Sequence, residues 1–111
     1  MNAQAPIRVV AVEDDPRFRQ TLATLMGHAP GFELSASFGS AEEALREATR
    51  AERGGSIEDW DLVLMDISLG GMNGIRATEK LRELDKNLPI VALTVFEEPR
   101  IIVEEIGRAH V

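Results

Sequence analysis

The feature that most constrains the fold of this chain is a run of four apolar residues that ends in a carboxylate, Leu62-Val63-Leu64-Met65-Asp66. A glycine-rich stretch, residues 67–74, follows it directly. A continuous apolar run bounded by turn signals is typical of a strand buried on both faces. Because ligands of open α/β sheets bind beyond the carboxyl ends of the strands, Asp66 is predicted at the functional rim of a sheet.

Other segments of the chain have the composition of further strands and helices. The strands are predicted at residues 7–12, 32–38 and 90–94, in addition to 62–66. The helices are predicted at residues 16–27, 41–53 and 75–84, with a fourth from 97 through 103. Strands that alternate with helices predict a mostly parallel sheet with helices on both faces. We therefore expect an α/β fold in a single domain.

Two of the helices carry clear start signals. Asp15 before Pro16 predicts the cap of the first helix, and Ser40 with an acid three residues on, Glu43, predicts the cap of the second. Apolar residues at helical spacing predict which faces are buried. These are Phe18, Leu22, Leu25 and Met26 of the first helix, and Ile75, Thr78, Leu81 and Leu84 of the third.

The composition argues against several classes of function. The 111 residues include 12 basic and 19 acidic side chains, a formal charge of −7, which disfavours direct binding to a nucleic-acid backbone. The absence of cysteine excludes disulfides and thiolate metal sites. No signal peptide or membrane span is recognisable, so we expect a cytoplasmic protein without membrane contact.

Polar residues stand at the ends of three predicted strands, namely Glu13 and Asp14, then Asp66, then Thr94. Each alone also fits a structural role as a turn residue, a helix cap or a β-former. Three carboxylates held together would repel unless a cation were bound, and Mg²⁺ prefers such oxygen ligands. An aspartate beside Mg²⁺ is a candidate phosphoryl acceptor, to whose phosphoryl group the Thr94 hydroxyl could donate.

Three blocks, in this order and at this spacing, resemble the receiver domain of two-component response regulators, the CheY-like family. They are Val12-Glu13-Asp14-Asp15-Pro16, the stretch from Leu62 to Gly74, and Val91-Ala92-Leu93-Thr94-Val95-Phe96-Glu97. The resemblance covers roughly residues 7–104, and the last two blocks look most like the LuxR/NarL-type subfamily, which carries a C-terminal helix-turn-helix. It implies a flavodoxin-like, doubly wound parallel sheet.

The resemblance also implies a role for each matching residue. Asp66 is the implied phosphoacceptor. Asp14 is implied to bind Mg²⁺ directly and Glu13 directly or through water, with the backbone carbonyl of Ser68 as a further ligand. Thr94 is implied to contact the phosphoryl group and to shift on phosphorylation.

Partners follow from the same resemblance. A sensor histidine kinase is implied as the phosphoryl source. The parent protein is expected to homodimerise and to bind DNA through an output domain absent from this chain. We do not expect an enzyme with an external substrate, because a receiver assists only its own phosphorylation and dephosphorylation.

The carboxyl end departs from the family pattern, which has a fifth strand followed by an essential lysine and then a fifth helix. The two lysines of this chain, Lys80 and Lys86, lie in or just after the third predicted helix and do not match that position. We therefore expect the strand order 2-1-3-4 with the fifth strand and fifth helix missing. An exposed apolar edge at residues 90–93 would then favour marginal stability or self-association.

The last six residues carry a separate signal. They can be back-translated as ATC GGA AGA GCA CAC GTC, which resembles a widely used sequencing adapter whose next triplet is a stop. We therefore expect a truncated receiver domain over residues 1–105 and a non-native tail over residues 106–111. The alternative is an ordinary helix end capped by Gly107.

The residues leave two other functions open. A Mg²⁺-dependent aspartyl-phosphate phosphatase usually has its nucleophile after the first strand and a second aspartate two residues on. Glu13-Asp14-Asp15 lacks that spacing. A phosphorylation-independent interaction module fits the missing lysine but not the complete set of acidic and hydroxyl residues.

Overall fold

The computed structural model describes residues 5–52, 59–67, 73–95 and 101–106. In chain order the elements are β1 (Ile7–Val12), α1 (Pro16–Gly27), β2 (Phe32–Phe38), α2 (Ala41–Glu52), β3 (Leu62–Asp66), α3 (Gly74–Leu84), β4 (Ile90–Val95) and β5 (Ile101–Ile106). The four predicted strands and the first three predicted helices are confirmed to within one residue at each end. None of the described helices is long and apolar enough to cross a lipid bilayer.

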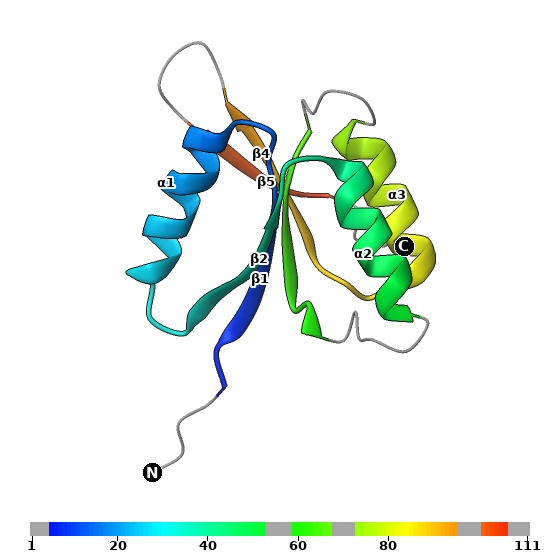
Figure 1. Ribbon diagram of the computed structural model, residues 1–111, viewed down its shortest axis with the longest axis horizontal. Helices are drawn as coiled ribbons and strands as arrows, with labels where there is room; N and C mark the ends of the chain where they lie inside the picture. The colour runs from blue at the N-terminus through cyan, green and yellow to red at the C-terminus, as the bar shows by residue number, and fades with distance from the viewer. Residues whose placement is uncertain (1–4, 53–58, 68–72, 96–100, 107–111) are drawn as a thin grey trace.

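The strands form one sheet with the order β2-β1-β3-β4-β5. β1 pairs in parallel with β2 and with β3, and β3 pairs in parallel with β4. The predicted flavodoxin-like parallel order 2-1-3-4 is therefore confirmed. α1 covers one face of the sheet, while α2 and α3 cover the other (Figure 1). The carboxyl ends of the four parallel strands consequently lie along one edge.

The prediction of a helix over residues 97–103 is wrong for residues 101–103, and its first part, residues 97–100, lies outside the described residues. Residues 101–106 instead form β5, which runs antiparallel to β4 with Ile106 opposite Ile90 and Ile101 opposite Val95. An acidic pair followed by proline is a local helix-start signal. The three β-branched residues that follow, however, favour a strand, and β4 offers a row of backbone groups that a strand can bond. Pairing with β4 therefore overrides the local signal.

The predicted exposure of the β4 edge at residues 90–93 is consequently wrong. β4 has β3 on one side and β5 on the other, so its backbone is paired along both sides. β5 runs antiparallel and contains no lysine, so it does not replace the family's lysine-bearing parallel strand. In the sheet order, β5 is the outer strand beside β4.

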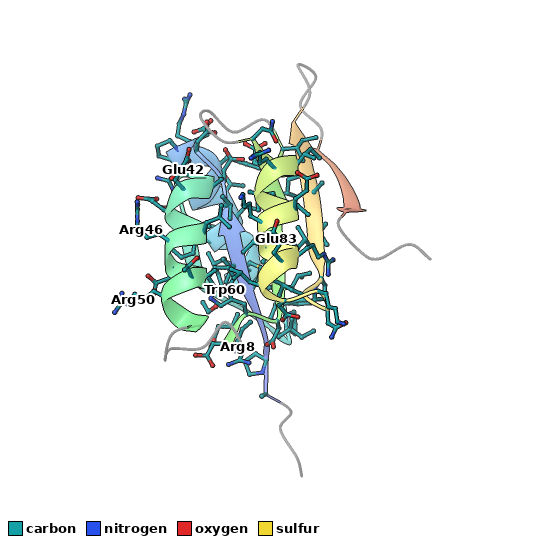
Figure 2. The ribbon with its side chains drawn as sticks, turned by 90° about the vertical axis from the view of Figure 1, so that its right-hand side faces the viewer. Arg8, Glu42, Arg46, Arg50, Trp60 and Glu83 are labelled. Carbon is teal, nitrogen blue, oxygen red and sulfur yellow. The ribbon has the colours of Figure 1, made fainter. Side chains whose placement is uncertain are left out.

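The face under α2 and α3 holds the larger core. Alternate residues of β1 and β3 point to this side, where small residues of the two helices allow close packing. The buried members are Val10, Val12, Ala41, Ala44, Ala48, Trp60, Val63, Met65, Ala77, Leu81, Leu88 and Ile90. Figure 2 shows Trp60 between α2 and α3. Its ring centroid lies 5.9 Å from that of Phe38, so Trp60 is a packing residue.

The face under α1 holds a smaller core, built around Val9, Ala11, Leu22, Leu64 and Leu93. Two residues of the predicted buried helix faces are exposed instead. Leu25 of α1 is 53% exposed and Ile75 of α3 is 50% exposed. Each helix meets the sheet along a narrow stripe. Ile75 follows the buried Gly74 and is turned away from it by roughly 100°, the rotation per helical residue.

An ion-pair cluster joins the amino ends of β1 and β3. Arg8 donates to Asp61 Oδ2 from its main-chain N–H (2.8 Å) and Nε (3.0 Å), and its Nη1 donates to Asp59 Oδ1 (2.9 Å). The Asp61 N–H donates back to the Arg8 carbonyl at 3.0 Å. These hydrogen bonds from Arg8 lower the pKa of Asp61. Figure 2 shows Arg8 at the lower end of the sheet, remote from the carboxyl ends of the strands.

Candidate functional site

Three carboxylates meet at the carboxyl edge of the sheet. Glu13 and Asp14 follow β1, and Asp66 ends β3, the strand beside it. One oxygen of each carboxylate lies within 4.8 Å of the other two. Glu13 and Asp66 are only 3% and 4% exposed, whereas Asp14 is exposed to solvent. This acidic cluster (Glu13, Asp14 and Asp66) therefore has two buried members and one open side.

Asp15 is the N-cap of α1 and does not belong to the acidic cluster. Its Oδ1 accepts a hydrogen bond from the Arg17 N–H at 2.9 Å, and Pro16 occupies the first turn of the helix. The predicted cap is therefore confirmed. The Asp15 N–H in turn donates to Glu13 Oε2 at 2.8 Å. The start of α1 thus holds the Glu13 carboxylate in place.

The pKa of Glu13 is raised from 4.5 to about 7, chiefly because the carboxyl group is buried. The hydrogen bond from the Asp15 N–H lowers the pKa, whereas the charge of Asp66 and the hydrogen bonds with Asp14 and Asp66 add smaller upward contributions to the same shift. In the absence of a cation, Glu13 is therefore partly protonated near neutral pH. Its proton limits the repulsion among the three carboxylates.

The acidic cluster fits a hard divalent cation. All three residues offer carboxylate oxygens, which Mg²⁺ prefers, and a bound cation would favour the ionised form of Glu13 and offset its repulsion from Asp66. Asp14, on the open side, is placed to bind an ion that keeps part of its water shell, as Mg²⁺ usually does. Nitrogen or sulfur ligands, which would favour zinc, are not part of the cluster.

The first turn of α3 packs directly against the main chain at the end of β3. A Cβ on Gly74 would overlap the Asp66 carbonyl oxygen and would lie 2.6 Å from Ile67 Cα, so only glycine fits there. Asn73 caps the helix by accepting a hydrogen bond from a first-turn N–H at 2.9 Å. The buried Thr78 hydroxyl donates to the Gly74 carbonyl at 2.8 Å. These contacts fix the helix start and, through Gly74, the backbone that carries Asp66.

Thr94 and Ser68 are the remaining residues predicted for the site. Asp66 pairs with Leu93 across β3 and β4, so the next residue, Thr94, has its backbone at the same edge of the sheet. Ser68 lies outside the described residues. The implied roles of both, and of the acidic cluster itself, stay predictions.

Sequence reasoning missed Arg19. The Arg19 Nη1 donates to the main-chain carbonyl of Glu13 at 2.8 Å. A signal was available, because a basic side chain so close to the amino end of a helix runs against the helix dipole. Such a residue suggests a compensating contact, and here that contact is with the acidic turn before α1.

Comparisons with known proteins agree with this geometry. The family model described as response regulator receiver domain matches residues 9–109. Response regulator GacA of Pseudomonas viridiflava is 32% identical over 92 residues, which are 83% of this chain and 40% of that protein. Nitrate/nitrite response regulator protein NarL of Escherichia coli (strain K12) is 27% identical over 108 residues, 97% of this chain and 47% of that protein. The chain therefore spans less than half the length of these two relatives.

A solved structure leads to the same family. The crystal structure of a two-component response regulator of the LuxR family, from Aurantimonas sp. SI85-9A1, matches with a TM-score of 0.70 and 29% identity. The match covers 84% of this chain and 61% of that one. From its sequence, its fold and these relatives, the chain belongs to the response regulator receiver domain family.

Proposed function

We propose that this segment is a phosphorylation-controlled receiver in which Asp66 accepts a phosphoryl group from a sensor histidine kinase. The observation that carries the proposal is the acidic cluster at the carboxyl edge of a receiver fold. Asp66 ends a buried strand and is held by its neighbours, while Asp14 opens the cluster to solvent. A phosphodonor can therefore approach from the side of Asp14.

The transfer requires one bond to form and one to break. A carboxylate oxygen of Asp66 attacks the phosphorus of a phosphohistidine, and the P–N bond breaks as the P–O bond forms. The imidazole leaves with the electron pair of the broken bond and takes up a proton from water. Strand β3 and the Gly74 contact hold the Asp66 backbone still during this attack.

Asp14 and Asp66 would hold Mg²⁺ in the active receiver, with Glu13 binding directly or through water and the Ser68 carbonyl as a further ligand. When bound, the ion would neutralise charge on the phosphoryl oxygens. Loss of the Glu13 proton accompanies loading, because the ionised carboxylate is the form that binds a cation. Thr94 then contacts the phosphoryl group from the neighbouring strand β4.

The output of the parent protein is proposed to be transcription control in the cytoplasm. Contact between Thr94 and the phosphoryl group would reorganise the segment after β4 and so change dimerisation or release of a DNA-binding output domain. The LuxR-family and NarL-type relatives support this assignment. The formal charge of −7 fits a segment that leaves DNA contact to another domain.

Phosphorylation of this 111-residue chain is expected to be slow. Lys80 lies on the exposed side of α3, and Lys86 follows the end of α3 that is remote from Asp66. Neither matches the family's lysine position, so a phosphoryl group on Asp66 would lack the paired ammonium. We therefore expect a low yield of phosphorylated protein, with the phosphoryl group still confined to Asp66.

The proposal is tested by incubating the protein with acetyl phosphate, with Mg²⁺ or with EDTA, and measuring intact mass. Addition of one phosphoryl group in Mg²⁺, and none in EDTA or in Asp66→Asn, is the expected result. Asp14→Asn should also abolish labelling. Asp15→Asn is the matched control, because asparagine caps a helix as well as aspartate and Asp15 stands outside the acidic cluster. Equal labelling of Asp66→Asn and the parent chain would refute the assignment.

The two alternative functions give different results in the same samples. A phosphatase would turn over p-nitrophenyl phosphate, whereas we expect no turnover. A phosphorylation-independent module would show no Mg²⁺-dependent binding of beryllofluoride, whereas a receiver binds it as a mimic of the phosphoryl group.

A further inference from the structure

We propose that Arg19 is a positioning residue that fixes the acidic turn at Glu13 and Asp14 for binding of the divalent cation. This inference rests on the proposed function, since it assumes that the acidic cluster holds Mg²⁺. The carrying observation is the 2.8 Å hydrogen bond from Arg19 Nη1 to the main-chain carbonyl of Glu13. That carbonyl belongs to the peptide bond that joins the two residues.

The main chain around Glu13 is held from two sides. On the sheet side, the Glu13 N–H donates to the Phe38 carbonyl of β2 at 2.9 Å. On the helix side, Arg19 bonds the Glu13 carbonyl, and the Arg19 N–H itself donates to the Asp15 carbonyl at 2.9 Å as part of the first turn of α1. The peptide that leads into Asp14 is therefore anchored between β2 and α1.

Asp14 is the member of the acidic cluster that most needs such an anchor. Glu13 and Asp66 are buried and their positions are restricted by packing, whereas Asp14 is exposed. Fixing the main chain before Asp14 lowers the number of positions that its carboxylate samples. A pre-organised ligand binds a cation more tightly than a mobile one.

The Arg19 side chain itself lies in a defined slot. A Cβ on Gly39 would be 3.2 Å from Arg19 Nη1 and 3.7 Å from Glu43 Oε2, so the guanidinium and this carboxylate both border Gly39. The Gly39 N–H donates to Glu43 Oε2 at 3.0 Å, which holds the carboxylate there. The absence of a side chain at Gly39 thus leaves the space that the guanidinium uses.

The positive charge of Arg19, taken alone, predicts the opposite effect on Mg²⁺ affinity. The direction in which the affinity changes therefore distinguishes the two roles. A permanent positive charge beside a cation site repels the cation. Removal of the charge would then tighten Mg²⁺ binding, whereas removal of an anchor would weaken it. We expect the anchor to dominate, because the hydrogen bond is direct while the charge is partly exposed and screened.

The experiment is a titration of ¹⁵N-labelled protein with MgCl₂, followed by the amide NMR signals of Asp14 and Asp66. Arg19→Gln is expected to weaken Mg²⁺ binding about 10-fold, the lower end of the effect for residues that orient metal ligands. Arg17→Gln is the matched control, because it removes the same charge from an exposed side chain of the same turn. Its affinity should stay within about 2-fold of the parent chain. Arg19→Lys, which keeps a donor and the charge, should recover most of the affinity.

Each possible result of the titration supports or overturns the positioning role of Arg19. Unchanged or tighter Mg²⁺ binding by folded Arg19→Gln overturns the role of Arg19 while leaving the receiver assignment intact. Failure of the parent chain to bind Mg²⁺ overturns the proposed function and this inference together. If Arg19→Gln does not fold, Gly39→Ala replaces it, since the added methyl would lie 3.2 Å from Arg19 Nη1 and would push the guanidinium by a few tenths of an ångström from its present position. Weaker Mg²⁺ binding by Gly39→Ala then supports the anchor, and parent-like binding refutes it.

Discussion

The Gly74 Cα faces the Asp66 carbonyl so closely that no side chain fits between them. Substitution Gly74→Ala must therefore shift α3 away from β3 or move the Asp66 backbone. Overpacking of this kind typically lowers the free energy of unfolding by about 1–3 kcal/mol. We expect Gly74→Ala to show that loss in urea denaturation, together with weakened Mg²⁺ binding. Gly27→Ala, at the end of α1 with open space around its Cβ, is the control and should be neutral or slightly stabilising.

The raised pKa of Glu13, about 7 against 4.5, predicts how stability depends on pH in EDTA. Between these two values the folded protein binds a proton that the unfolded chain releases. Stability from Glu13 is therefore fully present below about pH 4.5 and is lost as the pH rises through 7. The loss amounts to roughly 3 kcal/mol at most. Chemical denaturation at a series of pH values measures it.

Glu13→Gln should remove this fall in stability, and saturating Mg²⁺ should reverse it by stabilising the ionised cluster. The exposed Glu79→Gln is a control that should follow the parent curve. A Glu13→Gln curve parallel to that of the parent chain would show that Glu13 does not hold the proton.

The ion-pair cluster of Arg8 with Asp61 and Asp59 predicts an acid sensitivity of the opposite sign. Hydrogen bonds from Arg8 lower the pKa of Asp61, so its contribution is present above the ordinary value of 3.8 and is lost as the pH falls below it. Asp61→Asn should lower the melting temperature by a few degrees at pH 7 and by less at low pH. Asp59→Asn removes a single, largely exposed contact and should have a smaller effect. Equal effects of the two variants would contradict the geometry.

The pairing of β5 with β4 predicts the outcome of a truncation. Deletion of residues 96–111 would leave the apolar β4 without its outer neighbour, and such an edge promotes association between chains. We expect oligomers in size-exclusion chromatography with light scattering. Deletion of residues 107–111 alone retains β5 and should leave the elution unchanged. Identical behaviour of the two truncations would mean that β5 does not protect the edge.

The parallel core could be predicted from sequence because its signals agree with one another. Apolar runs such as Leu62–Asp66 specify buried strands, and the caps at Asp15 and Ser40 mark helix starts that the structure confirms. β5 could not be predicted locally. Its formation depends on the open edge of β4, a partner that exists only once the sheet has assembled.

The sequence could predict which residues form the candidate site, but not which of them are buried or which side chains contact them. Parallel strands bring Glu13, Asp14 and Asp66 to one edge whatever the details of packing. Which of the adjacent residues Glu13 and Asp14 is buried depends on the turn that they make before α1. The hydrogen bond from Arg19 and the space left by Gly39 are tertiary contacts between separate elements, so the spacing of residues alone does not reveal them.

Asp61 of the ion-pair cluster directly precedes β3, and Asp66 of the acidic cluster ends it, five residues further along the chain. At about 3.3 Å per residue they are separated by roughly 16 Å, which exceeds the screening length in physiological salt. Substitutions at the two ends should therefore combine additively. The stability contributed by the ion-pair cluster and the cation affinity of the acidic cluster should consequently be adjustable one without the other.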